Sequence, residues 1–200
     1  MRYLYLTLLL FCMPVLLSAQ HYVGLGGGGG TPNKIGLRLS LPVNIHLTRK
    51  ISLQPELVYV EHGTSQILRK LNNRDYRSSQ AAYLALPVLL KAGVTFEKLN
   101  IHLIVGPRFA YGIRLSANYL TDTGYFREKL SFDEAEFRPF DFGALFGVGL
   151  EKEINKNRKI FLEGRYYFGL IDLDREADRV IYPEGFYMNI GLLIPIGEKP

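Results

Sequence analysis

The feature that most constrains this chain is an alternation of apolar and polar side chains with a period of two. Between Ile51 and Tyr59 the odd-numbered residues are apolar or aromatic, whereas Ser52, Gln54 and Glu56 are polar. Successive side chains of a strand point to opposite faces, so this segment predicts a strand with one apolar and one polar face. The pattern recurs and predicts eight strands and no helix: His21–Gly28, Ile35–Leu47, Ile51–Tyr59, Ala82–Gly93, Ile101–Arg114, Phe140–Glu151, Ile160–Leu170 and Phe186–Ile196.

The connections between these strands differ in length at the two ends. At one end the predicted turns are short: Thr48–Lys50, Phe96–Leu99 and Asn155–Asn157. At the other end only the first connection, Gly29–Asn33, is brief, and the rest are long: His62–Ser79, Leu115–Phe137 and Ile171–Pro183. Compact soluble domains seldom contain several long structureless loops, whereas transmembrane barrels combine short periplasmic turns with long extracellular loops. Strands of about 9–11 residues also suffice to span a bilayer. We therefore expect an all-β fold, an eight-stranded antiparallel closed transmembrane barrel with both termini in the periplasm.

Residues 1–19 are typical of a secretory signal peptide. They contain Arg2, an apolar run from Leu8 to Leu17 and the small pair Ser18–Ala19, which predicts cleavage near Ala19–Gln20 and leaves residues 20–200 as the barrel domain. A lipoprotein is not expected, because Leu9-Leu10-Phe11 before Cys12 lacks small residues. The mature chain would hold 23 basic and 19 acidic residues and no cysteine. This composition excludes a disulfide scaffold, a thiol enzyme and a cysteine-ligated zinc site.

The basic balance, with an isoelectric point near 9.2, does not predict nucleic-acid binding. The basic residues are scattered in runs no longer than two, and an exported protein does not meet nucleic acid. Proximity to anionic lipid head groups is the interpretation that fits an envelope protein.

The polar faces of the predicted strands carry a balanced set of charges. With the apolar faces turned to lipid, four basic and four acidic side chains point into the lumen: Arg38, Glu56, Lys91, Arg108, Asp141, Glu151, Glu163 and Arg165. Eight strands enclose an interior just wide enough for side chains to fill, so opposite charges should pair and plug it. Glycines on the same face leave room for these side chains: Gly36, Gly106, Gly143, Gly147 and Gly149. A general diffusion pore is not expected.

Aromatic residues on the apolar face gather toward the long-loop end. They are Tyr59, Phe109, Tyr111, Phe140, Phe142, Tyr166, Phe168 and Phe186. Rings at one height of a barrel wall predict an aromatic girdle at the membrane interface.

No motif predicts a catalytic, cofactor or metal site. Gly24–Gly29 satisfies G-x-G-x-x-G, but no helix follows to bind a phosphate. The four histidines lack metal-ligand spacing, and we expect His46 and His102 to form hydrogen bonds in the lumen. The strand register places no serine beside a histidine, which argues against an acyl-hydrolase site.

Two acidic segments lie in the predicted loops. The run Asp172–Asp178 carries four carboxylates, but it lacks the glycine of an EF-type calcium loop and Arg175 and Arg179 offer internal partners. Asp133, Glu134 and Glu136 form the second segment. Both are expected to be solvated extracellular loops.

Several segments together resemble the PorT-type outer-membrane beta-barrel family of the Bacteroidota: Ala82–Lys91, Val105–Gly112, Phe140–Glu151 and Leu162–Leu170. A signal peptide followed by Gln20 is also typical of that phylum. The founding member is tied to the type nine protein-secretion system, so the resemblance implies the fold and, as one role, a link to that system. The C-terminal segment 194–200 departs from the barrel pattern, since it lacks a final aromatic residue.

We therefore expect a multi-pass outer-membrane protein, a monomeric barrel without enzymatic activity or cofactor. Its role is structural, binding or assembly, exerted through loops 62–79, 115–137 and 171–183, with outer-membrane lipids and envelope or secretion-system proteins as partners. Two alternatives stay open. An enzyme acting on outer-membrane lipid needs a catalytic pair at one interface, and a soluble periplasmic lipocalin-like barrel needs apolar residues inside and charges outside.

Overall fold

The computed structural model describes residues 21–30, 36–64, 76–121, 124–135, 137–175 and 180–196. The expected signal peptide and its cleavage site lie outside these residues. So do part of the first connection and the centre of the 62–79 segment. Glu136, and Asp178 and Arg179 of the acidic run, also lie outside them.

Strands make up nearly all of the described chain. They are β1 (His21–Gly30), β2 (Gly36–His46), β3 (Ile51–Thr64), β4 (Tyr76–Phe96), β5 (Leu99–Thr121), β6 (Gly124–Leu130), β7 (Phe140–Glu153), β8 (Lys159–Gly169) and β9 (Glu184–Ile196). A three-residue 3-10 turn, Asn155–Asn157, connects β7 to β8. Within the described residues, no helix is long and apolar enough to cross a membrane.

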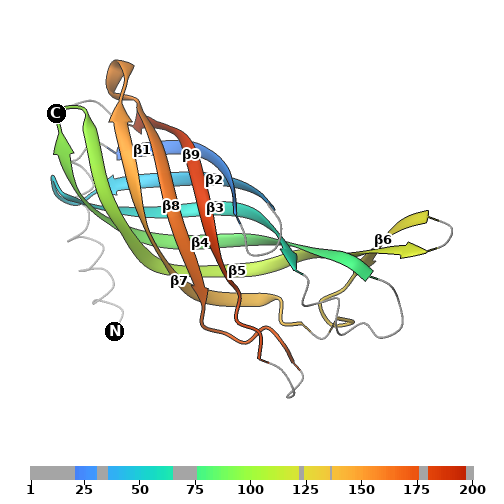
Figure 1. Cartoon of the computed structure of the whole chain (residues 1–200). Coiled ribbons are helices and arrows are strands. Elements are labelled where there is room, and N and C mark those ends of the chain that lie inside the picture. Colours follow the sequence, from blue (N-terminus) through green and yellow to red (C-terminus); the bar gives the residue numbers. More distant parts are fainter. Residues whose placement is uncertain are drawn as a thin grey trace.

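Eight of these strands close into a ring. The order β4-β3-β2-β1-β9-β8-β7-β5 is closed by the pairing of β4 with β5, and every pair is antiparallel. Figure 1 shows these strands tilted steeply around a common axis, with β6 lying away from the ring. The predicted eight-stranded antiparallel barrel is confirmed, and β6 is an additional strand that pairs with β5 outside the ring.

The alternation in the sequence becomes an alternation between the inside and the outside of the barrel. On β2, Leu37, Leu39 and Leu41 are exposed, whereas Arg38 and Ser40 are buried. A wall with apolar side chains outside and polar ones inside suits a hydrocarbon surround, and the closed ring leaves no sheet edge in contact with lipid. It is the reverse of the arrangement that a soluble ligand-binding barrel requires.

The prediction that 115–137 is a loop is wrong for its first half. β5 continues to Thr121, and β6 returns beside it with Leu115 opposite Leu130 and Thr121 opposite Gly124. The segment 62–79 is likewise shorter as a loop than expected, because β3 extends to Thr64 and β4 begins at Tyr76. The sequences of these extensions show no clear alternation of apolar and polar residues. Side-chain alternation therefore did not reveal them.

Other strand ends differ from the prediction by a few residues. The glycine run of β1 stays paired as far as Gly30 instead of turning after Gly28. The turn between β4 and β5 narrows to two residues, with Glu97 in the left-handed region (φ 51°). Backbone pairing, which does not depend on side-chain polarity, sets these ends.

Loop residues fold back over the long-loop end of the barrel and cover its interior. Ala135, Phe137 and Leu173 are buried in one cluster with the barrel side chains Val60 and Leu115. Backbone bonds hold this cap in place, from the Arg138 N–H to the Leu173 carbonyl (2.9 Å) and from the Gly112 N–H to the Pro139 carbonyl (2.7 Å). We call residues 131–135, 137–139, 171–175 and 180–181 the cap.

Candidate functional site

All eight side chains predicted to lie in the lumen are buried, with exposed fractions between 0 and 4%. They come from six strands: β2, β3, β4, β5, β7 and β8. The structure joins six of them in one network of ion pairs, and it places the other two, Arg108 and Asp141, together nearer the cap.

The centre of the interior is held by Arg165. Its two terminal nitrogens donate to both carboxylate oxygens of Glu56 at 2.8 and 2.6 Å, a bidentate pair that crosses the barrel from β8 to β3. The same guanidinium donates to Glu163, two residues earlier on its own strand. Arg38 approaches Glu56 from the other side at 3.6 Å and lies over the ring of Tyr187. Fork-shaped donors matched to carboxylates give the most directional charge pairing available to side chains.

Toward the short turns, Lys91 organises a second group. Its ammonium donates to Gln54 (3.0 Å), to Glu163 (3.2 Å) and to Glu151. These three acceptors satisfy the three hydrogens of a lysine ammonium. Lys159 of β8 approaches the other oxygen of Glu151 at 3.5 Å. Glu163 thus joins this group to the central one.

Toward the cap, the pair of Arg108 and Asp141 is completed by a tyrosine. Arg108 donates to one oxygen of Asp141 at 2.7 Å, and the hydroxyl of Tyr167 donates to the other at 2.6 Å. The guanidinium carbon of Arg108 lies 4.3 Å from the centre of the Tyr167 ring, within cation–π range. This group is surrounded by the apolar cluster that continues into the cap.

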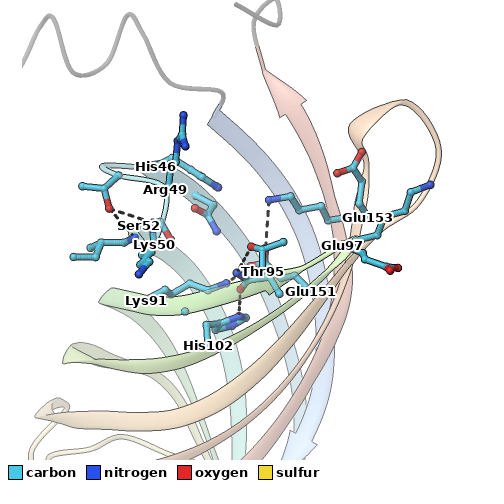
Figure 2. Close-up of a pocket in the computed structure, with 17 residues that line it drawn as sticks. His46, Arg49, Lys50, Ser52, Lys91, Thr95, Glu97, His102, Glu151 and Glu153 are labelled. Carbon is cyan, nitrogen blue, oxygen red and sulfur yellow. Dashed lines mark hydrogen bonds and ion pairs between the residues drawn. The ribbon is translucent and has the colours of Figure 1, made fainter.

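A polar vestibule opens at the short-turn end, with a cavity of about 80 Å³. Figure 2 shows Lys91, His102 and Glu151 at its floor and Arg49, Lys50 and Glu97 nearer its rim. Its walls carry five basic and three acidic side chains: Arg49, Lys50, Lys91, Lys98, Lys159, Glu97, Glu151 and Glu153. Below this floor the side chains of the central group are fully buried.

Three residues at the floor could in principle form a metal site. Ligand atoms of His102, Glu151 and Glu163 lie within 4.8 Å of one another. The Lys91 ammonium already bonds to both carboxylates and supplies the positive charge that a metal ion would bring. Spacing along the chain does not reveal this cluster, because its members lie on β5, β7 and β8 and meet only across the lumen.

His102 is used as a structural hydrogen-bonding group. Its Nδ1 lies 3.0 Å from the Asn100 side-chain oxygen and its Nε2 lies 3.4 Å from Glu163, so neither nitrogen is turned to a serine. His46 lies at the vestibule wall, with its ring 5.6 Å from that of Tyr22. An acyl-hydrolase needs a histidine nitrogen on its serine, and His102 does not offer one.

Two lumen glycines are required by close approach rather than by backbone angle. A Cβ on Gly149 would collide with the His102 ring and would meet the Glu163 side chain at 2.7 Å. A Cβ on Gly143 would meet the Tyr167 hydroxyl at 2.6 Å. The small residues on β7 therefore make the space that the long charged and aromatic side chains occupy.

The eight predicted girdle residues lie on the outer wall, exposed or half-buried. Several are cross-strand neighbours: Phe109 faces Phe142 with ring centres 5.0 Å apart, and Tyr166 faces Phe186. This puts them in a band near the loop end, and their contact with the membrane interface stays a prediction.

The acidic loop residues act mainly as local structural groups. Asp172 accepts the backbone N–H groups of Asp174 and Ile181, which closes a turn of the cap. Asp133 pairs with Arg175 at 2.6 Å. Glu134 and Ser131 exchange side-chain to backbone hydrogen bonds, and those bonds lower the pKa of the Glu134 carboxyl. This reciprocal pattern is a capping box.

Several lumen residues were missed by the sequence prediction. Tyr167, Tyr187 and Asn189 are buried inside the barrel, whereas Gln54 is buried on the polar face that the alternation predicts. The signal was present, because Tyr167 is two residues from Arg165 and so shares its face. The prediction named only charged side chains and histidines for the lumen, so the tyrosines on the same face were left out.

The comparisons with known proteins agree with the barrel. A family model for the outer membrane protein beta-barrel domain matches residues 29–175. Among curated protein sequences, none matches the chain. Three solved structures are similar across most of their length. The N-terminal beta-barrel domain of Pseudomonas aeruginosa OprF shares 12% identity, with 90% of this chain and 98% of that chain covered and a TM-score of 0.47.

The other two are Ail, the attachment invasion locus protein of Yersinia pestis, and Neisserial surface protein A. Ail shares 9% identity, with 90% of this chain and 100% of that chain covered and a TM-score of 0.49. Neisserial surface protein A shares 7% identity, with 88% and 95% covered and a TM-score of 0.47. The family match over residues 29–175, together with the closed ring and its apolar outer wall, shows that this chain belongs to the outer membrane protein beta-barrel domain family.

Proposed function

We propose that this protein is a non-enzymatic outer-membrane barrel with a closed lumen that binds a protein partner through its long-loop end. The observation that carries the proposal is the three-stranded sheet that projects beyond the ring. We call this sheet the paddle; it is made of residues 76–81 of β4, 115–121 of β5 and 124–130 of β6. The pairing of β5 with β7 ends at Tyr111 and Phe140, whereas residues 62–64 of β3 pair with residues 79–81 of β4 at the base of the paddle.

The paddle is long enough to stand clear of the membrane. Residues Leu115–Thr121 add about 20 Å beyond the ring at roughly 3.3 Å per residue. Arg127 of β6 ties the three strands together, because it donates to Ser116 of β5 at 3.1 Å and to Gln80 of β4 at 3.3 Å. A sheet that projects beyond the ring and carries its own cross-strand contacts supports a role in recognition.

The outer edge of β6 supports a protein partner in particular. β6 is the terminal strand of the sheet, so in the described part of the chain its outer backbone groups face no neighbouring strand. An exposed edge accepts an extended segment of another chain by continuing the ladder of backbone hydrogen bonds. The resemblance to PorT-type barrels makes components of the type nine secretion system candidate partners.

The filled interior supports a role outside the lumen. The charged groups between the vestibule and the cap are paired and buried, and the cap covers the far end. In planar bilayers, the purified protein should therefore conduct ions near the background level. A large and steady conductance would contradict the closed lumen.

Site-specific photo-crosslinking in intact cells tests the partner. A photoreactive residue at Phe126, an exposed position of β6, should give a discrete crosslinked band. The same residue at Leu162, exposed on the membrane-facing wall, is the matched control and should give none.

A second variant separates the paddle from the barrel. Replacing residues 117–128 with Asn-Gly joins Ser116 to Lys129, which already face each other, through a two-residue hairpin turn. This variant should keep the heat-dependent gel shift of a folded barrel, and partner binding should be lost. Equal partner recovery with and without the paddle would refute the proposal.

A further inference from the structure

An apolar groove lies on the outside of the barrel at the short-turn end, opposite to the paddle. It has a volume of about 540 Å³, and its lining side chains include Ile51, Ala92, Val94, Ile101, Leu103 and Val148. These residues come from four neighbouring strands, β3, β4, β5 and β7.

The groove exists because a small residue interrupts a row of large ones. Ala92 faces Ile51 on one side and Leu103 on the other, and Leu103 in turn faces Val148. Along its own strand Ala92 lies between the exposed side chains of Leu90 and Val94. In a membrane such a depression is covered by the hydrocarbon part of a lipid, which is the only apolar material at that depth.

A lysine stands at the mouth of the groove. Lys50 belongs to the lining residues and precedes Ile51 in the turn between β2 and β3. Its carbonyl accepts the Gly93 N–H at 2.8 Å, and Thr48 accepts the N–H groups of Lys50 and Ile51. These bonds fasten the turn to β4, so they hold the backbone of Lys50 beside the groove. Within the described residues, the Lys50 ammonium forms no ion pair with a carboxylate.

The surrounding turns are also basic. Arg49 and Lys50 lie in one turn, Lys98 lies in the next and Arg158 in the third, against a single acidic residue, Glu97, in the same turns. Figure 2 shows Arg49 and Lys50 on one side of the vestibule rim and Glu97 on the other. Basic side chains at a membrane surface attract the phosphates of anionic lipids.

We propose that this groove is a binding site for an anionic phospholipid, with one acyl chain against Ala92 and the phosphate on Lys50. The apolar lining selects the chain, and the unpaired ammonium selects the negative head group over a zwitterionic one. The site is independent of the paddle. A lipid bound there belongs to the membrane leaflet on the short-turn side.

Native mass spectrometry of the purified protein tests this site with two lipids of the same acyl chains, phosphatidylglycerol and phosphatidylethanolamine. We expect the wild type to bind phosphatidylglycerol about fivefold more tightly, the factor expected for one basic residue at a membrane surface. Lys50→Gln should reduce phosphatidylglycerol to the level of phosphatidylethanolamine. Ala92→Phe, which fills the groove, should weaken both lipids.

Two controls match these changes in charge and in volume. Arg158→Gln removes a basic residue from another short turn, and Ala144→Phe enlarges an alanine on the outer wall near the loop end. Arg158→Gln should keep most of the preference for phosphatidylglycerol, and Ala144→Phe should bind both lipids like the wild type. Ala92→Leu repeats the filling with a smaller residue if the Phe variant does not give the gel shift of a folded barrel. Equal binding of the two lipids by the wild type, or an Arg158→Gln effect as large as that of Lys50→Gln, would overturn the proposal.

Discussion

The interior of the barrel differs between its central part and its loop end. In the centre, Arg165, Glu56 and Glu163 are joined by charged hydrogen bonds that connect β8 to β3 across the lumen. At the loop end, Phe137 and Leu173 are covered by apolar contacts among residues of the cap and the strand ends. Breaking a central contact disturbs strands that are far apart in the sequence, whereas breaking a cap contact disturbs two loops.

This difference predicts that central residues set the stability of the whole barrel, whereas cap residues set the local mobility of the loop end. Burying an unpaired charge is costly in every state in which the ring stays closed, so loss of a central partner should lower the stability of the whole barrel. The cap can lift without opening any strand pair of the ring. Loss of a cap side chain should therefore appear mainly as local opening.

The largest effect is expected from Glu163→Ala. The change removes the carboxylate that joins Arg165, Lys91 and His102, and it should cost about 3–5 kcal/mol in the free energy of unfolding. Urea unfolding in detergent measures this difference. The neighbouring Leu162→Ala, on the lipid-facing wall, is the control and should cost less than about 1 kcal/mol, because detergent replaces the lost contacts. Equal effects of the two variants would contradict a paired interior.

A smaller and more local effect is expected from Phe137→Ala. Phe137 is buried in the cap cluster, and truncating a buried phenylalanine costs about 3 kcal/mol or more where the site cannot collapse. Amide hydrogen exchange should become faster at Arg138, whose N–H donates to the Leu173 carbonyl, and at Leu173, whose N–H donates to the Ile181 carbonyl. Exchange should stay unchanged in β8. Faster exchange throughout the ring would show that the cap and the barrel open as one unit.

Two adjacent tyrosines allow the stability contributions of a hydrogen bond inside the barrel and of one on its outer wall to be compared. Tyr167 donates to Asp141 inside the barrel, and Tyr166 donates to Glu184 on the outer wall at 2.8 Å. Tyr167→Phe should cost about 1.5–3 kcal/mol, because it removes a buried bond to a charged group. Tyr166→Phe should cost below about 0.5 kcal/mol, because water replaces an exposed partner. Urea unfolding of the pair tests this, and a reversed order would contradict the placement of the two rings.

The smallest effect is expected when the pH is lowered and the capping box of the cap loses its charged carboxylate. The bonds to Ser131 lower the pKa of the Glu134 carboxyl, so the folded state favours the charged form. Such a group stabilises the fold above its ordinary pKa, and that contribution is lost as the pH falls through the lowered value. The protection factor of the Ser131 amide, which compares its exchange with that of an unstructured amide at the same pH, should therefore fall below about pH 4.5. Glu134→Gln should remove this pH dependence, because it replaces the carboxylate that accepts the Ser131 N–H, and an unchanged profile in that variant would argue against the capping box.

The fold could be predicted from the sequence because two environments act on each barrel strand. Lipid outside and a filled lumen inside require opposite side chains at successive positions, so residues such as Leu162 and Glu163 reveal the strand by themselves. The eight lumen charges follow from the same alternation. The paddle did not follow from it, because β6 and the ends of β4 and β5 project beyond the ring and meet neither environment.

The candidate site could be predicted in content but not in its contacts. The alternation indicates that Arg165 and Glu56 both point inward, but they lie 109 residues apart along the chain. Which inward residues meet depends on the tilt and stagger of the strands around the ring, and no local pattern encodes these. The cluster of His102, Glu151 and Glu163 escaped prediction for the same reason.

Three features can be predicted from the amino-acid sequence alone. They are the barrel fold, the face of the wall on which each strand residue lies and the balance of charge in the lumen. These properties depend on periods of two residues and on composition, which are local. Three other features depend on the tertiary structure. Lys91 neutralises two carboxylates, and Phe132 and Phe137 of one loop cover the lumen. Ala92 opens a groove beside Lys50. Each of these depends on the register between strands, because a shift of two residues keeps every side chain on its face while changing all of its neighbours.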